Sequence, residues 1–254
     1  MNPNRKPIAA ANWKMHKTVD EAVAFVKAIQ EETGPLEDRE VVIAPPFTAL
    51  HAMRKLLNRK GYNLSAQNCY WEEKGAFTGE VSPVMLKGVG CDYVIVGHSE
   101  RRHIFGETDE MVRKKAAAVL KIGMLPIICV GEALDQREQG KTFDVVGTQV
   151  DRALEGLNPD QVSRLVIAYE PVWAIGTGKT ATPGQAQEVH AFIRQRVEGL
   201  FDKEVANKVR ILYGGSVKPD NVDALMAEPD IDGSLIGGAS LEVGSFKRLI
   251  QFKS

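Results

Sequence analysis

Residues 93–130 read YVIVGHSERRHIFGETDEMVRKKAAAVLKIGMLPIICV, and this stretch decides the fold. It begins with the apolar, β-branched run Tyr93–His98 and ends with a second such run, Leu125–Val130. Between them, Thr108–Lys121 carries its apolar residues at near-helical spacing. Short apolar runs of this kind fit strands that are covered on both faces. The stretch therefore predicts a strand, a helix and a second strand parallel to the first.

The same alternation extends over the whole chain, and no linker or change in composition divides it. The predicted strands are Ile8–Lys14, Val41–Pro45, Leu64–Asn68, Tyr93–His98, Leu125–Val130, Leu165–Tyr169, Val209–Gly214 and Gly233–Ile236. Helical stretches lie between them, including Thr18–Glu31 and Gly184–Phe201, which Pro183 opens. Eight units, each a strand followed by a helix, in 254 residues fit an α/β fold: a closed (β/α)8 barrel of eight parallel strands surrounded by helices. We predict one barrel domain over residues 1–254, with an open doubly wound sheet as the alternative.

The composition excludes several classes of protein. Hydrophobic residues make up 44% and charged residues 26%, unlike a disordered chain, a collagen or a coiled coil. The formal net charge of -1 gives no overall basic character that would recruit nucleic acid or a membrane surface. Cys69, Cys91 and Cys129 are widely spaced and predict neither a disulfide framework nor a metal cluster. The absence of a signal-peptide core and of a membrane-length apolar run predicts a cytoplasmic protein.

Polar side chains end three of the predicted strands. Alternation groups Asn12 and Lys14 with the small Ala10, so an inward Ala10 would place both at the carboxyl-terminal mouth. His98 ends the fourth strand and Glu170 follows the sixth. A lysine at this mouth needs an anion, and a partly buried carboxylate suits a general base. A solvated lysine, a structural histidine and a salt-bridged glutamate are the alternatives. The convergence of lysine, histidine and glutamate side chains from three strand ends favours a catalytic site.

Glycines at loop positions suggest a phosphate site. The GTGKT stretch at 176–180 resembles a phosphate loop, but Trp173 stands where the Walker pattern requires glycine. It also lacks the strand–turn–helix context of a dinucleotide fingerprint. Gly214-Gly215-Ser216 and Gly237-Gly238 end the last two strands, where barrel enzymes often bind phosphate through backbone N–H groups. Plain tight turns are the alternative.

Five motifs together resemble the triosephosphate isomerase family, in that family's order and over essentially the whole chain. They are Asn12-Trp13-Lys14-Met15, GHSERR at 97–102, AYEPVWAIGTGK at 168–179, YGGS at 213–216, and Gly237-Gly238. The resemblance implies a TIM barrel and an intramolecular aldose–ketose isomerase of glycolysis and gluconeogenesis. That enzyme interconverts dihydroxyacetone phosphate and D-glyceraldehyde 3-phosphate through an enediolate, without a cofactor or metal.

The resemblance also implies roles for particular residues. Glu170 is expected to move the proton between the two carbons, and His98 to act as the electrophile on the carbonyl side. Lys14 is expected to face the substrate's negative charge, and Asn12 to help bind the substrate. The residues expected to hold the phosphate are Gly176, Ser216, Gly237 and Gly238.

A lid is expected over this site, because an enediolate exposed to water would lose its phosphate. By resemblance it consists of Pro171, Val172, Trp173, Ala174, Ile175, Gly176, Thr177, Gly178 and Lys179. Proline and tryptophan would stiffen its entry, while the two glycines let the backbone approach the phosphate.

Family members are usually dimers or larger, with the loop after the third strand reaching into the partner's site. Here Tyr70–Ser82 occupies that place, with Gly75, Phe77 and Thr78 near its tip. Phe77 would be an unusual residue to leave in water. We therefore expect a homodimer, with a self-folded surface loop as the alternative.

Two other functions stay open at this point. One is another phosphate-binding barrel enzyme, such as a sugar-phosphate epimerase or a Schiff-base aldolase, although no late strand carries an aldolase lysine. The other is a non-catalytic barrel that binds phosphate ligands, although all the matched site residues are present.

Overall fold

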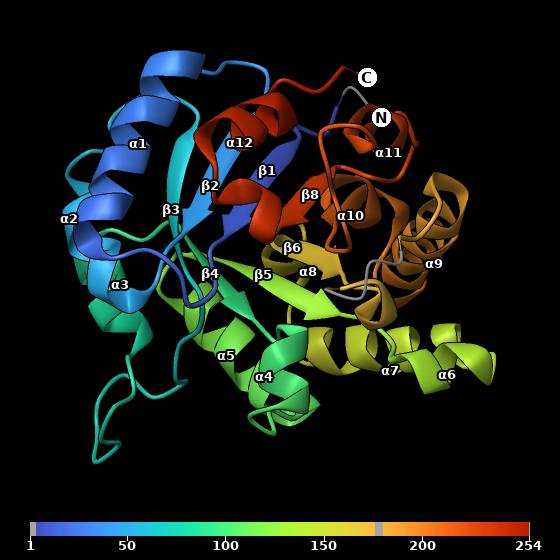
Figure 1. The fold of residues 1–254 in the computed structure, drawn as a ribbon. Coiled ribbons are helices and arrows are strands. Elements are labelled where there is room, and N and C mark those ends of the chain that lie inside the picture. The colour runs from blue at the N-terminus through green and yellow to red at the C-terminus, as the bar shows by residue number, and fades with distance from the viewer. Residues whose placement is uncertain (1–3, 176–179, 254) are drawn as a thin grey trace.

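The computed structural model describes residues 4–175 and 180–253. Its strands are all parallel and close into a barrel in sequence order, with β8 paired to β1. They are β1 (Ile8–Asn12), β2 (Glu40–Ala44), β3 (Tyr62–Ala66), β4 (Tyr93–Val96), β5 (Leu125–Val130), β6 (Val166–Tyr169), β7 (Arg210–Tyr213) and β8 (Gly233–Ile236). Figure 1 shows the helices surrounding them. The predicted (β/α)8 TIM barrel is confirmed, and closure between β8 and β1 excludes the open sheet.

Helices and short 3₁₀ turns connect the strands. The helices are α1 (Val19–Thr33), α2 (Leu50–Arg54), α3 (Pro83–Val89), α4 (Ser99–His103), α5 (Asp109–Lys121), α6 (Leu134–Glu138), α7 (Thr142–Leu154), α8 (Pro159–Val162), α9 (Pro183–Leu200), α10 (Lys203–Lys208), α11 (Val222–Met226) and α12 (Val243–Ile250). The 3₁₀ turns are η1 (Phe47–Ala49), η2 (Val172–Ala174) and η3 (Gly238–Ser240). As predicted, Pro183 lies in the first turn of α9, and the Thr182 side chain caps that helix.

Two apolar layers form the core, because strand side chains alternate between the barrel interior and the surrounding helices. The interior layer consists of Ile8, Ala10, Val42, Ala44, Tyr93, Ile95, Ile127, Cys129, Val166, Ala168, Leu212 and Leu235. Ala11 and Trp13 belong instead to the layer between barrel and helices. This alternation directs Asn12 and Glu170 toward the interior, since they continue the series of Ala10 and Ala168.

Three strands end two residues earlier than predicted, and two of these differences affect the site. The first strand stops at Asn12, so Lys14 lies in the loop beyond it, with a positive φ of 51°. The fourth strand stops at Val96, because Gly97 turns the chain with a φ of 71°. The third strand runs from Tyr62 to Ala66, two residues earlier than predicted.

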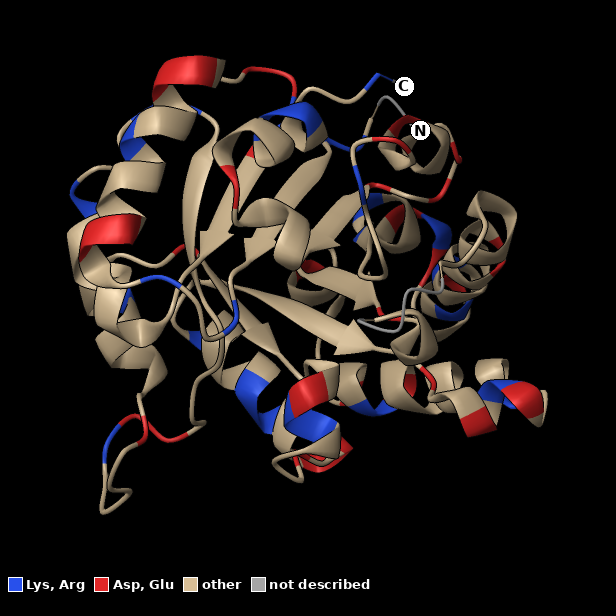
Figure 2. Cartoon of the chain, viewed as in Figure 1, with Lys and Arg blue, Asp and Glu red and all other residues tan. Residues whose placement is uncertain are grey.

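Figure 2 shows Lys and Arg residues interspersed with Asp and Glu residues along the helices and loops around the barrel. No helix within residues 4–175 and 180–253 is both long and apolar enough to cross a membrane. In the same part of the chain, no group of three or more His, Cys, Asp or Glu side chains could hold a metal ion.

Candidate active site

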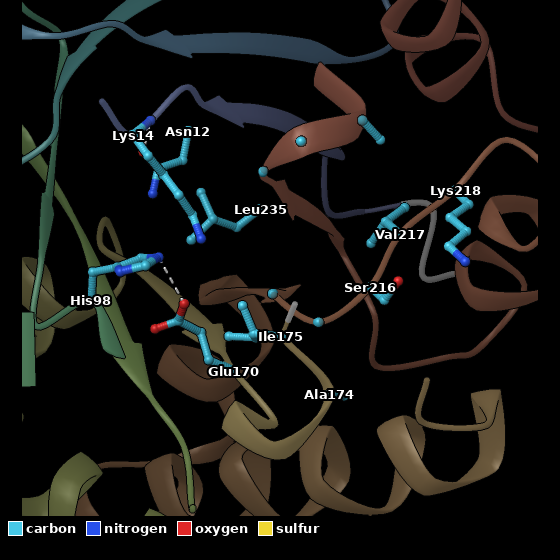
Figure 3. Close-up of a pocket in the computed structure, with 15 residues that line it drawn as sticks. Asn12, Lys14, His98, Glu170, Ala174, Ile175, Ser216, Val217, Lys218 and Leu235 are labelled. Atoms are coloured by element: carbon cyan, nitrogen blue, oxygen red, sulfur yellow. Dashed lines mark hydrogen bonds and ion pairs between the residues drawn. The ribbon is translucent and has the colours of Figure 1, made fainter. Parts of the chain in front are cut away.

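A cavity of about 290 Å³ lies at the carboxyl-terminal mouth of the barrel. Its lining residues are Asn12, Lys14, His98, Glu170, Ala174, Ile175, Gly214, Gly215, Ser216, Val217, Lys218, Leu235, Gly237, Gly238 and Ala239. The structure thus brings together every described residue that we predicted to be catalytic or to bind phosphate (Figure 3). Gly176, predicted to bind phosphate, lies outside the described residues. The size of the cavity suits a small ligand.

Glu170 is buried at the end of β6, where its carboxylate has three partners. Its Oε1 lies 3.0 Å from His98 Nε2, as the dashed line in Figure 3 marks. The Ser99 backbone N–H donates to Oε2 at 2.9 Å, and the Ser99 hydroxyl lies 3.3 Å from Oε1. Burial raises the pKa of the Glu170 carboxyl, but His98 and the Ser99 N–H lower it further than burial raises it. Glu170 is therefore an ionised base in this arrangement.

His98 reaches the mouth through the turn at Gly97 and caps the N-terminus of α4. Its Nδ1 accepts the Glu100 backbone N–H at 3.2 Å, which places the proton of a neutral ring on Nε2, facing Glu170. Burial lowers the pKa of His98, whereas the Glu170 carboxylate raises it to a net value above the usual one. A ligand that separates the pair removes the larger of the two causes that raise this pKa, and the Glu100 carboxylate, 3.7 Å from Nδ1, remains as the other. Burial, the Lys14 ammonium and the Glu100 N–H then favour the neutral imidazole.

Lys14 is held in the mouth by its backbone and its ammonium group. Its N–H donates to Asn12 Oδ1 at 3.1 Å, and its carbonyl accepts from Gln67 Nε2 at 2.8 Å. These bonds hold a left-handed conformation that is unfavourable for a lysine. Its Nζ pairs with Glu100 Oε1 at 2.7 Å. The Lys14 ammonium is therefore a fixed cation beside His98, and it forms an ion pair with the Glu100 carboxylate.

The ends of β7 and β8 form the side of the cavity between Glu170 and Lys14, because a Cβ on Gly214 would lie 2.9 Å from Glu170 Cγ and one on Gly237 3.5 Å from Lys14 Cε. Ser216, Gly237 and Gly238 lie there, as predicted. A side chain at Gly215 would overlap the Tyr213 hydroxyl and come within 2.9 Å of Pro171 Cγ. Glycine is needed at this position because backbone and neighbouring side chains approach so closely. Together with Gly214, Gly237 and Gly238, it leaves backbone accessible on this side of the cavity, which suits an anion held by N–H groups.

The described part of the predicted lid, Pro171 to Ile175, includes the turn η2. The Trp173 indole N–H donates to Glu132 Oε1 at 2.9 Å, and the Tyr169 hydroxyl lies 3.1 Å from the same oxygen. The Arg137 guanidinium lies 4.6 Å from the centre of the Trp173 ring. The other predicted lid residues, Gly176, Thr177, Gly178 and Lys179, lie outside the described residues.

The predicted dimer loop projects from the barrel between β3 and α3 (Figure 1). Phe77 is 41% exposed, and its ring packs 4.5 Å from that of Tyr70 within the same loop. A side chain at Gly75 would come within 3.0 Å of the Phe77 ring, so glycine allows this packing. Thr78 also lies in the exposed part of the loop. An exposed aromatic tip fits either a partner surface or a self-folded loop.

Several residues of the site received no role from the sequence patterns, among them Ser99, Glu100 and Leu235. Ser99 holds the Glu170 carboxylate, Glu100 contacts Lys14 and His98, and Leu235 lies in the cavity wall. Ser99 and Glu100 belong to the GHSERR motif at 97–102, and their polar side chains next to His98 could have indicated that they lie in the site. For Leu235 the signal was its place in an alternating strand.

The barrel and its mouth together define the class of this protein. It is a (β/α)8 barrel in which a carboxylate, an imidazole and a lysine meet at the carboxyl ends of the strands, where barrel enzymes have their active sites.

Comparison with known proteins identifies the family within this class. The family model described as "Triosephosphate isomerase" matches residues 7–253. The triosephosphate isomerase of Pelobacter propionicus is 55% identical over 249 residues, which cover 98% of this chain and 99% of the relative. That of Chloroflexus aurantiacus is 55% identical over 249 residues, with 98% and 100% covered. That of Roseiflexus sp. is 55% identical over 248 residues, with 98% of each chain covered. The chain belongs to the triosephosphate isomerase family.

Proposed function

We infer that this protein is a triosephosphate isomerase that interconverts dihydroxyacetone phosphate and D-glyceraldehyde 3-phosphate in glycolysis and gluconeogenesis. The family supports the activity. The observation that carries the chemistry is the 3.0 Å contact between Glu170 Oε1 and His98 Nε2 inside the cavity that Lys14 lines. An ionised base and an N–H donor side by side are what proton abstraction next to a carbonyl requires.

The proposed reaction starts when the substrate separates Glu170 from His98. Glu170 takes a proton from C1 of dihydroxyacetone phosphate, and the C–H electron pair forms the C1–C2 double bond. The carbonyl electrons move to O2, where the His98 Nε2–H and the Lys14 ammonium stabilise the negative charge. A proton passes from O1 to O2, and Glu170 returns its proton to C2. The product is the aldehyde, with the base regenerated.

The remaining groups bind the substrate and protect it. Asn12 contributes to substrate binding, and backbone groups of Ser216, Gly237, Gly238 and Gly176 hold the phosphate. The lid from Pro171 to Lys179 excludes water, because an enediolate in water would lose its phosphate. The substrate's charge suits a cavity that contains a lysine.

We further propose that residues 1–254 form one barrel domain and that the protein is a cytoplasmic homodimer. The exposed Phe77 at the tip of the Tyr70–Ser82 loop supports the dimer, since contact with a partner would remove its ring from water. Sedimentation of the purified protein tests this assembly. A Phe77→Ser variant should shift the equilibrium toward monomers, and a monomeric wild-type protein would contradict the proposal.

A coupled assay of the purified protein in both directions, in buffer containing a chelator, tests the activity. Rapid turnover of both triose phosphates is the expected result. A protein that binds phosphate compounds without interconverting the two trioses would contradict the proposed function. Trapping of substrate on a lysine by borohydride would indicate an aldolase instead.

A further inference from the structure

The backbone of Glu170 lies unusually close to a glycine at the end of β5. The Glu170 N–H donates to the Val130 carbonyl at 2.7 Å. A Cβ on the next residue, Gly131, would overlap the Glu170 carbonyl oxygen and lie 2.7 Å from the carbonyl carbon. Because the obstacle is backbone, no side-chain rotation could relieve it. The position of the Gly131 peptide therefore limits where the Glu170 backbone can lie.

The other side of Glu170 is bounded in the same way by Gly214, at the end of β7. The Gly214 N–H donates to the Tyr169 carbonyl at 2.7 Å. A Cβ on Gly214 would lie 2.9 Å from Glu170 Cγ. Glu170 is thus enclosed between two glycines, and a shift of either flank would move the carboxylate relative to His98.

The Gly131 peptide is held by one side chain from outside the barrel, that of Gln149 on α7. The Gly131 N–H donates to Gln149 Oε1 at 2.7 Å, and Gln149 Nε2 donates to the Gly131 carbonyl at 3.2 Å. These paired bonds fix both polar groups of a buried residue at the end of a strand. α7 packs against β5, so the amide is anchored on a rigid element.

We propose that Gln149 is a positioning residue for Glu170, which it holds in place through the Gly131 peptide. The inference rests on the proposed function, in which Glu170 is the base. Gln149 is not among the residues that line the described cavity, so it acts on the rate without touching substrate. A base displaced by a fraction of an ångström transfers protons more slowly, while phosphate binding at β7 and β8 is unaffected.

The test compares Gln149→Met with wild type in the coupled triose phosphate assay. Methionine keeps the side-chain volume and removes both hydrogen bonds. We expect kcat to fall about tenfold with KM changed less than twofold. Gln149→Glu keeps an acceptor for the Gly131 N–H and should lose about threefold. It serves as the test variant if Gln149→Met does not fold.

Gln161→Met is the matched control. Gln161 Oε1 also accepts a backbone N–H, that of Asn158 at 2.9 Å, but at α8, before β6 begins. This variant loses a comparable hydrogen bond and should keep the wild-type kcat. An equal loss of kcat in Gln161→Met would overturn the proposal, as would wild-type kcat in Gln149→Met or, where that variant does not fold, in Gln149→Glu.

The Glu170→Gln background separates this proposal from the proposed function. Without the base, the position of residue 170 no longer matters, so adding Gln149→Met should change the residual kcat less than twofold. A further tenfold loss would show that Gln149 acts independently of Glu170 and would overturn its positioning role. Wild-type activity in Glu170→Gln alone would instead remove the proposed base.

Discussion

The two ends of the barrel both bury charged side chains, but in different arrangements. At the amino-terminal end, just before β8, Asp232 is fully buried between Arg5 Nε at 2.6 Å and Arg194 Nη2 at 2.7 Å. The Ile211 N–H also donates to it at 2.9 Å. At the carboxyl-terminal end, Glu170 and His98 contact one another beside a cavity.

The difference indicates what each arrangement does. The Asp232 cluster satisfies both carboxylate oxygens with groups of the protein, so it holds β7, β8 and the N-terminal segment together. The Glu170–His98 pair lines the cavity, so a ligand that enters between the two side chains can replace their contact with contacts of its own. Changes at the amino-terminal end should therefore affect stability, and changes at the mouth should affect catalysis.

The largest effect is expected at the amino-terminal end of the barrel. Asp232→Asn removes the buried carboxylate that Arg5 and Arg194 share. Asp230 remains 2.6 Å from Arg194 Nε but 3.9 Å from Arg5 Nη2, so the free energy of unfolding should fall by about 3 kcal/mol. Urea unfolding measures this change, and the folded variant should keep a kcat within twofold of wild type. Glu204→Ala, which removes an exposed partner of Lys208, is the control and should leave the urea midpoint unchanged. A large loss of kcat in folded Asp232→Asn would contradict the separation of the two ends.

At the mouth, His98→Gln tests the electrophile. The amide lacks the imidazole N–H at that position, so kcat should fall by about 10²-fold, the usual scale for losing a donor to a developing oxyanion. The urea midpoint should change far less than that of Asp232→Asn. His51→Gln, on α2, is a control that should behave as wild type in the coupled assay. Near-normal kcat in His98→Gln would show that another group polarises the carbonyl.

Lys14→Ala tests the fixed cation. Its loss removes a charge that attracts the substrate and stabilises the enediolate, so KM should rise and kcat should fall. We expect kcat/KM to drop at least about tenfold. A rise in KM alone would indicate a role in substrate binding, and a fall in kcat a role in the chemical step. Lys27→Ala, on α1, is the control and should keep wild-type kinetics. Unchanged kinetics would place Lys14 outside the site.

The smallest effect concerns pH and His190, which lies on α9. His190 is fully buried between the Tyr169 and Tyr213 rings, with Nδ1 3.2 Å from the Asp230 carbonyl oxygen. Burial lowers its pKa to about 3, although the Asp230 carbonyl opposes the shift.

The sign of the pH effect follows from this lowered pKa. Below pH ~6.5 the unfolded chain binds a proton at residue 190 that the folded protein does not bind until about pH 3. Stability should therefore fall as the pH is lowered through this range, by about 1.4 kcal/mol per unit from this group. Urea unfolding between pH 7 and pH 5, compared with His190→Asn, measures the contribution. Equal slopes in the two proteins would show that His190 does not titrate this way.

The fold was predictable because alternation between short strands and helices is a local property of the sequence. The same alternation correctly directed Glu170 inward, since Val166 and Ala168 belong to the interior layer. The same alternation fails for His98, because it groups His98 with Val94 and Val96, which face the helices. Only the turn at Gly97, which strand periodicity does not reveal, brings His98 into the mouth.

Contacts between distant residues were not predictable from the pattern. The bond between Ser99 and Glu170 spans 71 positions, and the pairing of Gln149 with Gly131 spans 18. Nothing in the residue types marks a glutamine on α7 as the anchor of a strand end. Barrel closure creates these contacts, so they emerge from the structure alone.

The role of Glu170 as the base is tested most directly by the kcat of Glu170→Gln in the coupled triose phosphate assay, measured on protein whose urea midpoint matches wild type. Glutamine fills the same space but cannot accept the proton from carbon. The proposed mechanism predicts that kcat falls by about 10²-fold or more. A kcat within tenfold of wild type would contradict the assignment of Glu170 as the base on which the proposed mechanism depends.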